Sequence, residues 1–560
     1  MRKLVIPKQP EVNIGTAGHV DHGKCLSIDE EVLIDGEATD GNSIWDVASE
    51  RGEVVFEDED SKLYRLPELR ALSFGPLGFV GSDALLYVQR YSGPIVELST
   101  DRGRIRATPN HRFYGRLGWV EARDLKEGDA ILAYEGGIEW ARVEGVRLLD
   151  FDDYLFDLSV PYYHNFVSGN GLLCHNTTMI EAITGIWTSA HSEELRRGIT
   201  IKVGYADAPI YRCKSCEPPT CYTVKPECPC GGEAELERVV SFVDCPGHES
   251  LMANMLSGAA LMDGAILVIA ANEDVPRPQT REHLMALQML GTKHIVVVQN
   301  KLDLVDDKAA LENYHKIRDF LEGTIAENAP IIPISAQFKL NIDAVLEAIE
   351  KFIPTPERDP KKPPLMYVLR SFDVNKPGTP IRELKGGVVG GSLIQGTLEV
   401  GDEIEIRPGI YRDGVFESVT TKVASLGTSA GLVDRVGPGG LIAIGTYIDP
   451  AYTKSDSLVG NVVGRPNELP PVLNELTLEI QLFELAVGTP EPVKVEKIKV
   501  GEPIRLNVAT AVTLGVVSRI RDDLVEMKLR RPVCASEGGR AALSRRIGNR
   551  WRLIGSGIIR

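Results

Sequence analysis

A phosphate-binding loop interrupted by a long insert constrains this chain more than any other feature. Residues 18–24 follow the pattern G-x-x-x-x-G-K, but Cys25 stands where such a loop needs Ser or Thr to hold Mg²⁺. The required hydroxyl is encoded far downstream, at Thr177. If residues 25–176 are removed, Lys24 is followed directly by Thr177 and the loop is complete. The sequence therefore indicates two nested proteins, an insert and a host.

The two ends of the insert carry the groups needed to remove it. The thiol of Cys25 can accept the acyl group of Lys24 as a thioester, because sulfur is a good nucleophile and thioesters are easily displaced. The hydroxyl of Thr177 can then capture this acyl group as an ester. Asn176 can attack its own carbonyl through its side-chain amide and release the insert. The free amine of Thr177 then recovers the acyl group as a peptide, so no outside cofactor is needed.

Several blocks of the insert resemble those of inteins, and the likeness spans the whole insert. Thr108-Pro-Asn-His111 resembles the block whose threonine and histidine polarise the amide before the first cysteine. The segments 154–160, 164–166 and 172–176 resemble the two C-terminal blocks. The resemblance implies that three side chains assist the later steps, namely Asp157, His164 and His175. The last of these helps Asn176 to cyclise, and proton transfers of this kind contribute roughly 10²–10⁴-fold each.

The interior of the insert predicts a compact all-β fold of the intein, or Hint, type. Short β-rich runs at 30–34, 95–98 and 130–134 are separated by Gly and Asp turns. Nothing in the segment resembles a homing-endonuclease motif, which favours a minimal intein. Cys174 is a second thiol close to the C-terminal junction. It could be inert or could compete with the reactive groups, and the sequence leaves both open.

Charge supports the same division of the chain. The formal net charge is −17, which is awkward for a protein that handles nucleic acid. The segment 25–176 has 14 basic and 28 acidic side chains, so most of this charge leaves with the insert. The N-terminal region does not resemble a signal peptide, and no apolar stretch approaches the roughly 18 residues of a membrane span. We therefore expect a soluble, cytoplasmic protein that does not bind a membrane.

The host predicts a doubly wound α/β domain with a mainly parallel sheet, followed by two β-barrels. Continuous apolar runs typical of strands buried on both faces occur at 11–16, 239–244, 264–271 and 294–299. Helical patterns lie between or after them, at 250–262, 279–290, 308–321 and 342–352. We expect the α/β domain to comprise 1–24 and 177–357, and the barrels to comprise 365–466 and 467–560.

The α/β domain carries the parts of a nucleotide site. Backbone N–H groups of the completed loop can cradle phosphates, Lys24 can neutralise the β and γ groups, and Thr177 can coordinate Mg²⁺. The predicted contacts of this loop are Gly18, His19, Val20, Asp21, His22, Gly23, Lys24, Thr177 and Thr178. At the end of the next predicted strand, Asp244 fits the Mg²⁺ shell and Gly247 fits the γ-phosphate.

Two later motifs select the base. Asn300-Lys301-Leu-Asp303 follows a valine-rich strand, and the Asp303 carboxylate can accept both N1–H and N2–H of guanine. Adenine offers no such pair of donors, so the sequence predicts guanine. The segment after the last strand fits a contact to the guanine carbonyl through Ser335, Ala336 and Gln337.

Two further residues are candidates for the chemistry of hydrolysis. Thr200 would reach Mg²⁺ only when the γ-phosphate is present, which makes an order-to-disorder switch. His248 is the candidate for orienting the attacking water. Its alternative is a structural histidine beside the phosphates, and the residues alone leave both open.

Together these motifs resemble the translational GTPases of the elongation factor Tu type. The likeness narrows to the gamma subunit of archaeal and eukaryotic translation initiation factor 2, on the segments 198–207, 251–259, 370–378 and 384–391. It implies a GTP- and Mg²⁺-dependent GTPase that carries initiator methionyl-tRNA to the small ribosomal subunit, as one subunit of a heterotrimer with alpha and beta subunits. The insert favours the archaeal form. Two alternatives are an elongation-type carrier of aminoacyl-tRNA and the GTPase subunit of a metabolic enzyme such as that of sulfate adenylylation.

A cysteine cluster at 211–232 resembles a zinc ribbon. Cys213 and Cys216 form the first pair of thiols, and Cys228 and Cys230 form the second. The family usually spaces the second pair as C-x-x-C, whereas here it is C-x-C. Cys221 lies between the pairs and could replace one of the second pair. A disulfide and a metal-free vestige are the alternatives to zinc, the former being unusual in the cytosol.

Overall fold

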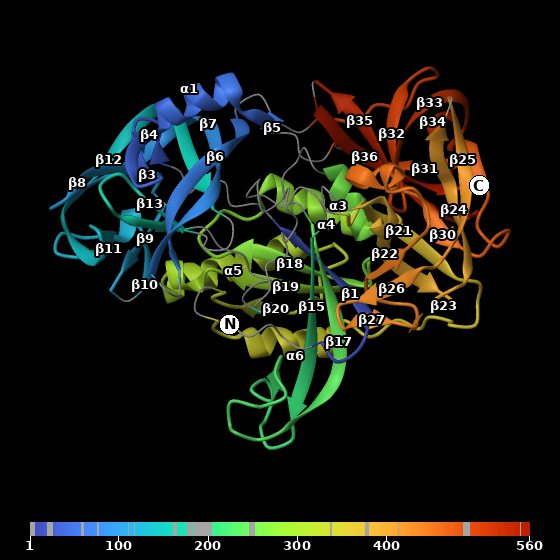
Figure 1. Ribbon diagram of the computed structural model, residues 1–560, viewed down its shortest axis with the longest axis horizontal. Helices are drawn as coiled ribbons and strands as arrows, with labels where there is room; N and C mark the ends of the chain where they lie inside the picture. The colour runs from blue at the N-terminus through green and yellow to red at the C-terminus, as the bar shows by residue number, and fades with distance from the viewer. Residues whose placement is uncertain are drawn as a thin grey trace. The chain divides into compact units, whose positions relative to one another are not determined.

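The computed structural model describes most of the 560 residues and separates them into two compact units (Figure 1). The described residues are 6–18, 26–57, 61–75, 78–109, 111–116, 118–160, 165–175, 183, 204–245, 252–336, 339–375, 380–412, 414–484, 486, 493–548 and 550–560. The described part of the insert forms one unit, and the described part of the host forms the other.

The host begins with a seven-stranded sheet in the order β16-β15-β17-β1-β18-β19-β20. Strands from β17 to β20 are parallel, and β15 pairs antiparallel with β17. The bounds are Val12–Gly18 (β1), Gly204–Cys213 (β15), Tyr222–Thr223 (β16), Ala234–Asp244 (β17), Gly264–Ala270 (β18), His294–Asn300 (β19) and Ile331–Pro333 (β20). The doubly wound, mainly parallel sheet that the sequence predicts is therefore confirmed.

Helices cover both faces of this sheet. The helices are α3 (Met252–Ala259), α4 (Pro278–Leu290), α5 (Asp307–Leu321) and α6 (Ile342–Phe352). The first three pack in one apolar cluster, and α6 packs in a second cluster with the other face of β1. Helix α5 starts where the Asp306 side chain accepts from the N–H of Ala309, and α4 ends at Gly291, whose φ of 79° suits glycine.

Strands β15 and β17 extend beyond the rest of the sheet as a long hairpin (Figure 1). Strand β1 pairs with β17 only over residues 240–244, so residues 234–239 continue past it. The four cysteines of the expected ribbon lie at the far end of this hairpin, near β16. The nucleotide motifs follow the opposite, carboxyl end of β17. The cluster is therefore separated from the nucleotide motifs by the length of the strand.

The first β domain is an eight-stranded antiparallel sheet in the order β25-β24-β30-β21-β22-β29-β26-β27, with a small β23-β28 ladder. Its strands enclose one apolar core. The bounds are Leu365–Phe372 (β21), Val388–Gln395 (β22), Leu398–Glu399 (β23), Glu403–Arg412 (β24), Val415–Lys422 (β25), Ser425–Thr428 (β26), Gly431–Val433 (β27), Arg435–Val436 (β28), Ile442–Gly445 (β29) and Val462–Gly464 (β30).

The second β domain is a closed barrel of six strands in the order β31-β34-β33-β32-β35-β36. Buried and exposed residues alternate along β33, as expected where one face of a strand meets the core. The bounds are Val472–Leu482 (β31), Pro503–Val508 (β32), Ala511–Arg521 (β33), Leu524–Cys534 (β34), Arg540–Ile547 (β35) and Arg550–Ile559 (β36).

The insert is built on a 13-stranded sheet that surrounds its own apolar core. Helix α1 (Gly41–Arg51) is an addition to the expected all-β fold, and it begins where Asp40 accepts from the N–H of Ser43 at 3.0 Å. The strands are Leu26–Ser27 (β2), Glu31–Ile34 (β3), Glu37–Asp40 (β4), Glu53–Glu57 (β5), Ser61–Gly75 (β6), Gly78–Thr100 (β7), Gly103–Ala107 (β8), Arg112–Gly115 (β9), Gly118–Glu121 (β10), Ala130–Tyr134 (β11), Ile138–Ser159 (β12), Asn165–Val167 (β13) and Leu173–His175 (β14).

Candidate functional site

The carboxyl edge of the host sheet brings two predicted nucleotide residues together. Gly18 ends β1 and Asp244 ends β17, and these strands are parallel neighbours. The hydroxyl of Thr16 donates to the Asp244 carboxylate at 2.8 Å, and both residues are buried. This bond fixes the carboxylate at the strand end, where ligands bind in open α/β sheets.

The two motifs that the sequence predicts to select the base meet at the same edge. Asn300 ends β19, and its side-chain oxygen accepts from the backbone N–H of Lys301 at 2.8 Å and of Ala336 at 3.1 Å. The hydroxyl of Ser335 donates to the Asp303 carboxylate. Lys301 has a φ of 67°, which turns the chain sharply after the strand. Asn300 thus joins two loops that are far apart in sequence, and Ser335 fixes the direction of Asp303.

Many of the predicted site residues lie outside the described residues. In the nucleotide site they are His19, Val20, Asp21, His22, Gly23, Lys24, Thr177, Thr178, Thr200, Gly247, His248 and Gln337. In the splicing site they are Cys25, His164 and Asn176, together with Thr177 again. Their roles stay predictions from the sequence.

The structure places the described N-terminal edge of the insert between two of its predicted catalytic blocks. Leu26, the residue after Cys25, pairs with Ala107 of β8 and with Phe156 of β12. These two residues directly precede Thr108 and Asp157 in the sequence. The block around Thr108 and the block around Asp157 therefore converge on the strand that begins the insert.

The threonine and histidine of the first block are held in one buried turn. The N–H of His111 donates to the carbonyl of Thr108 at 2.9 Å, and both residues are almost fully buried. The His111 ring lies 5.1 Å from that of Phe113 and 6.3 Å from that of Phe166. Packing against these two aromatic rings holds the His111 ring in a defined orientation.

The C-terminal end of the insert lies beside that turn. Strand β14, which ends at His175, pairs with β13, and Cys174 pairs with Phe113 of β9. Cys174 is fully buried, and burial raises the pKa of its thiol, with further contributions from the charges of Asp157 and Glu30. A thiol with a raised pKa is a poor nucleophile. This environment favours the inert alternative for Cys174 over competition with the splicing groups.

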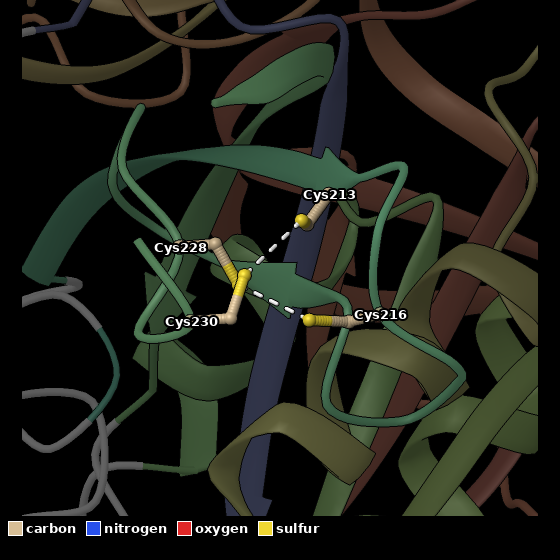
Figure 2. A group of neighbouring side chains, drawn as sticks. All are labelled: Cys213, Cys216, Cys228 and Cys230. Atoms are coloured by element: carbon tan, nitrogen blue, oxygen red, sulfur yellow. Dashed lines mark hydrogen bonds between the residues drawn. The ribbon is translucent and has the colours of Figure 1, made fainter. Parts of the chain in front are cut away.

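The four cysteines of the expected ribbon converge at the tip of the β15–β17 hairpin (Figure 2). The Sγ atoms of Cys213, Cys216, Cys228 and Cys230 all lie within 4.8 Å of one another. Cys213 approaches Cys230 and Cys216 approaches Cys228 at 3.7 Å each. Cys221 is fully buried, and its carbonyl accepts from the N–H of Cys213, so its place is in the wall beneath the cluster. The C-x-C pair therefore supplies two thiols to the group.

Three family models match the chain in its different parts. The model for the Elongation factor Tu GTP binding domain matches residues 171–355, and that for Initiation factor eIF2 gamma, C terminal, matches residues 474–559. The model for an Intein splicing domain matches residues 84–176.

Curated relatives decide the family. Translation initiation factor 2 subunit gamma of Archaeoglobus fulgidus is 61% identical over 396 residues, covering 70% of this chain and 93% of the relative. The subunits of the same name from Pyrococcus abyssi and Methanocaldococcus jannaschii are 59% and 57% identical, and 94% of each is covered. The chain belongs to the family of translation initiation factor 2 gamma subunits. Within this chain the host is a translational GTPase, and the insert is a self-splicing intein.

Solved structures support the fold of the gamma subunit. The bacterial selenocysteine-specific elongation factor EF-Sec matches with a TM-score of 0.52 at 24% identity, over 68% of this chain and 55% of that chain. The elongation factor SelB from Methanococcus maripaludis, solved with the GTP analogue GppNHp, matches with a TM-score of 0.50 at 19% identity, over 68% and 75%. None of the helices in the described ranges has the length and hydropathy that a transmembrane helix needs.

Sequence reasoning missed two contributions to the nucleotide edge of the gamma subunit. Thr16 was not singled out, because a threonine inside a buried strand carries no distinctive signal before its partner Asp244 is known. Ser335 was expected to contribute through its backbone, whereas its side chain also holds Asp303. Both roles depend on contacts between segments that are distant in sequence.

Proposed function

We propose that the spliced product carries initiator methionyl-tRNA to the small ribosomal subunit while bound to GTP, as the gamma subunit of a heterotrimer with alpha and beta subunits. The observation that carries this proposal is the relative from Archaeoglobus fulgidus, which is matched over 93% of its length at 61% identity. A likeness this extensive covers the GTPase domain and both β domains together.

Splicing would join Lys24 to Thr177 and excise residues 25–176. The host would then consist of a GTPase domain (1–24 and 177–357), with the ribbon at 211–232, and of two β domains (365–466 and 467–560). The family implies GTP, GDP and Mg²⁺ as ligands. Support for these boundaries comes from the loop that they restore and from the match of the intein model, which ends at residue 176.

The described residues fit a guanine nucleotide at the carboxyl edge of the host sheet. Asp244 would belong to the Mg²⁺ shell, and Asp303 would accept from the guanine N1–H and N2–H groups. Thr16 and Ser335 hold these two carboxylates in place before any ligand binds. Preorganised acceptors of this kind contribute to specificity, because a base that lacks the matching donors leaves them unpaired.

The cysteine cluster fits a structural zinc ion. Four thiols converge from two short loops, as tetrahedral zinc sites require. Backbone N–H groups of Ser215 and Gly232 approach the sulfurs of Cys213 and Cys230 at 3.4 Å each. The contact from Gly232 lowers the pKa of the Cys230 thiol to about 7. Such N–H donors stabilise thiolate charge, so we propose that Cys213, Cys216, Cys228 and Cys230 hold zinc and that Cys221 does not.

The test of the tRNA proposal compares nucleotide states of the spliced protein. The protein, assembled with its alpha and beta subunits, is loaded with GTP or GDP and mixed with labelled initiator methionyl-tRNA. Filter binding should show retention with GTP and much weaker retention with GDP. Negligible retention in both states would reject the carrier function and favour a GTPase subunit of a metabolic enzyme.

An elongator methionyl-tRNA serves as the matched control for tRNA class. It carries the same amino acid, so any difference must come from the tRNA body. Preference for the elongator species would favour an elongation-type carrier, whereas preference for the initiator species supports the proposal.

A further inference from the structure

A charged cluster lies next to the strand that begins the intein. Strand β2 is short, and Leu26 pairs on one side with Ala107 of β8. The antiparallel register therefore places Ser27, the next residue, beside Arg106. Opposite residues of an antiparallel pair project to the same side of the sheet. Arg106 is thus two residues before Thr108 in the sequence, and its partner Ser27 is two residues after Cys25.

Arg106 binds the segment that leaves β2. Its Nε donates to the Glu30 carboxylate at 3.2 Å, and its Nη2 donates to Asp29. The hydroxyl of Ser27 donates to the other oxygen of Asp29. The Arg106 guanidinium therefore holds residues 27–30 against strand β8. Because donor and acceptor are both charged, these hydrogen bonds are stronger than bonds between neutral groups.

The same segment also contacts the C-terminal hairpin of the intein. The N–H of Gly169 donates to the carbonyl of Glu31 at 2.6 Å, and Val32 forms an isolated bridge with Ser168. A side chain added to Gly169 would meet the Cβ of Glu31 at 2.3 Å, so the backbone approach is close. The turn at 168–171 leads directly into β14, which ends at His175 beside the second junction.

A second link ties this hairpin to β8. The side-chain amide of Asn170 donates to the carbonyl of Arg104 at 3.3 Å. Strand β8, the segment 27–32 and the turn before β14 therefore form a closed set of contacts. The segment that follows the first splice junction is thus connected with the turn that leads to the second junction.

One carboxyl of the cluster changes its charge near neutral pH. Burial raises the pKa of Glu30 to about 7, against the opposing effect of Arg106. Burial also opposes ionisation of Asp29, but its bond from Ser27 and the charge of Arg106 bring its pKa below the usual value. The charges of Glu30 and Asp157 also raise the pKa of the Cys174 thiol, so the cluster interacts electrostatically with the C-terminal block. Glu30 is thus the member whose charge changes around neutrality.

We propose that Arg106, Asp29 and Glu30 form a positioning cluster that holds the two splice junctions of the intein in register with each other. The cluster does not touch the reacting atoms. It fixes the segment 27–32 between β8 and the C-terminal hairpin, so that the acyl group released from the first junction is transferred rather than lost to water. Beyond the splicing activity itself, these three residues would then decide whether the host segments are ligated or are released as separate fragments.

The first test replaces Arg106 in the full precursor. Arg106→Met keeps an unbranched stem of the side chain and removes the guanidinium with its charge. Intact-mass analysis of the products should show the ratio of ligated host to unligated fragments reduced by at least about tenfold, because the variant loses two charge-assisted hydrogen bonds and either one alone contributes about that much. Arg104→Met is the matched control, since its side chain is exposed on the same strand, and it should splice like the unmodified chain. A ligated fraction in Arg106→Met equal to that of the control would overturn the proposal.

A second variant keeps the proposal testable if Arg106→Met does not fold. In Glu30→Gln the shape is retained and the titrating group is lost. In the unmodified chain the ligated fraction should fall as the pH is lowered from 8 to 6 through the pKa of Glu30, because the ion pair with Arg106 weakens. Glu30→Gln should behave at every pH as the unmodified chain does at low pH. A pH profile that is the same in both proteins would refute the role of Glu30 and with it the cluster.

Discussion

Ser335→Ala in the spliced protein tests whether guanine selection depends on a preoriented carboxylate. The hydroxyl of Ser335 donates to the Asp303 carboxylate. A hydrogen bond to a charged group contributes about 1.5–3 kcal/mol. If all of it serves to orient Asp303, GDP should bind about 10- to 150-fold more weakly in the variant.

The assay is titration with fluorescent GDP, repeated by competition with IDP, whose base lacks the N2 amine. Part of the contact to Asp303 is already missing with IDP, so Ser335→Ala should weaken IDP binding less than GDP binding. Ser518→Ala is the matched control, because this serine is exposed on β33 in the last barrel. Equal losses for GDP and IDP would show that Ser335 supports the fold of the loop rather than the choice of base, and unchanged affinity for both would refute the reasoning entirely.

Three further outcomes are expected. Cys25→Ala with Asn176→Ala should leave only the full-length chain by intact mass, and this precursor should bind fluorescent GDP weakly because its loop is still interrupted. Cys216→Ser should remove zinc, measured by elemental analysis, while GDP affinity stays within about twofold, since the cluster lies at the far end of β17 from the nucleotide edge. Burial raises the pKa of Glu282 in α4 from 4.5 to about 7, against its ion pair with Arg552 at 3.6 Å. A raised carboxyl pKa stabilises the fold at low pH and loses that effect as the pH rises through 7, so the unmodified protein should lose at most about 3 kcal/mol of unfolding free energy relative to Glu282→Gln between pH 5 and 8.

The host sheet could be predicted because its strands are continuous apolar runs. The segment 264–270 is buried on both faces, and both its type and its position follow from composition alone. The last strand, β20, was expected only from the motif that follows it at Ser335, because a run of three residues ending in Pro333 carries almost no pattern of its own. The register of β15 against β17, with its irregularity after Ile210, depends on a partner that the local sequence does not specify.

The insert shows the limits of local patterns more clearly. The sequence indicated only 95–98 of the 23-residue strand β7, because Gly81, Gly93 and Pro94 resemble turn signals. The strand continues through Gly93 and Pro94 because β12 pairs with it from Thr100 back to Leu85, and it continues through Gly81 because β6 pairs with it there. Glycine and proline break isolated strands, but a long antiparallel partner supplies enough hydrogen bonds to carry the ladder past them.

The residues of the candidate sites also differ in how far local sequence patterns identify them. Asn300 and Asp303 could be assigned from spacing after a strand, since the strand itself fixes where they point. The choice between Cys221 and Cys230 could not, because either thiol satisfies a sequence pattern for metal binding. The structure separates them by burial: Cys221 lies in the wall of the hairpin tip, and Cys230 stands exposed among the other three thiols.

The separation of apolar cores explains how an insert can occupy the most sensitive loop of a GTPase. Among the described residues, the core of the insert consists of its own side chains, from Leu26 to Cys174, and the clusters on either face of the host sheet consist of host side chains. Strand β1 is paired on both sides, with β17 and β18, while the insert is still present. Hydrophobic burial provides most of the stability of each unit, and the described cores of both units are already formed in the unspliced chain. Excision therefore acts on a host whose strand β1 already holds its place between β17 and β18.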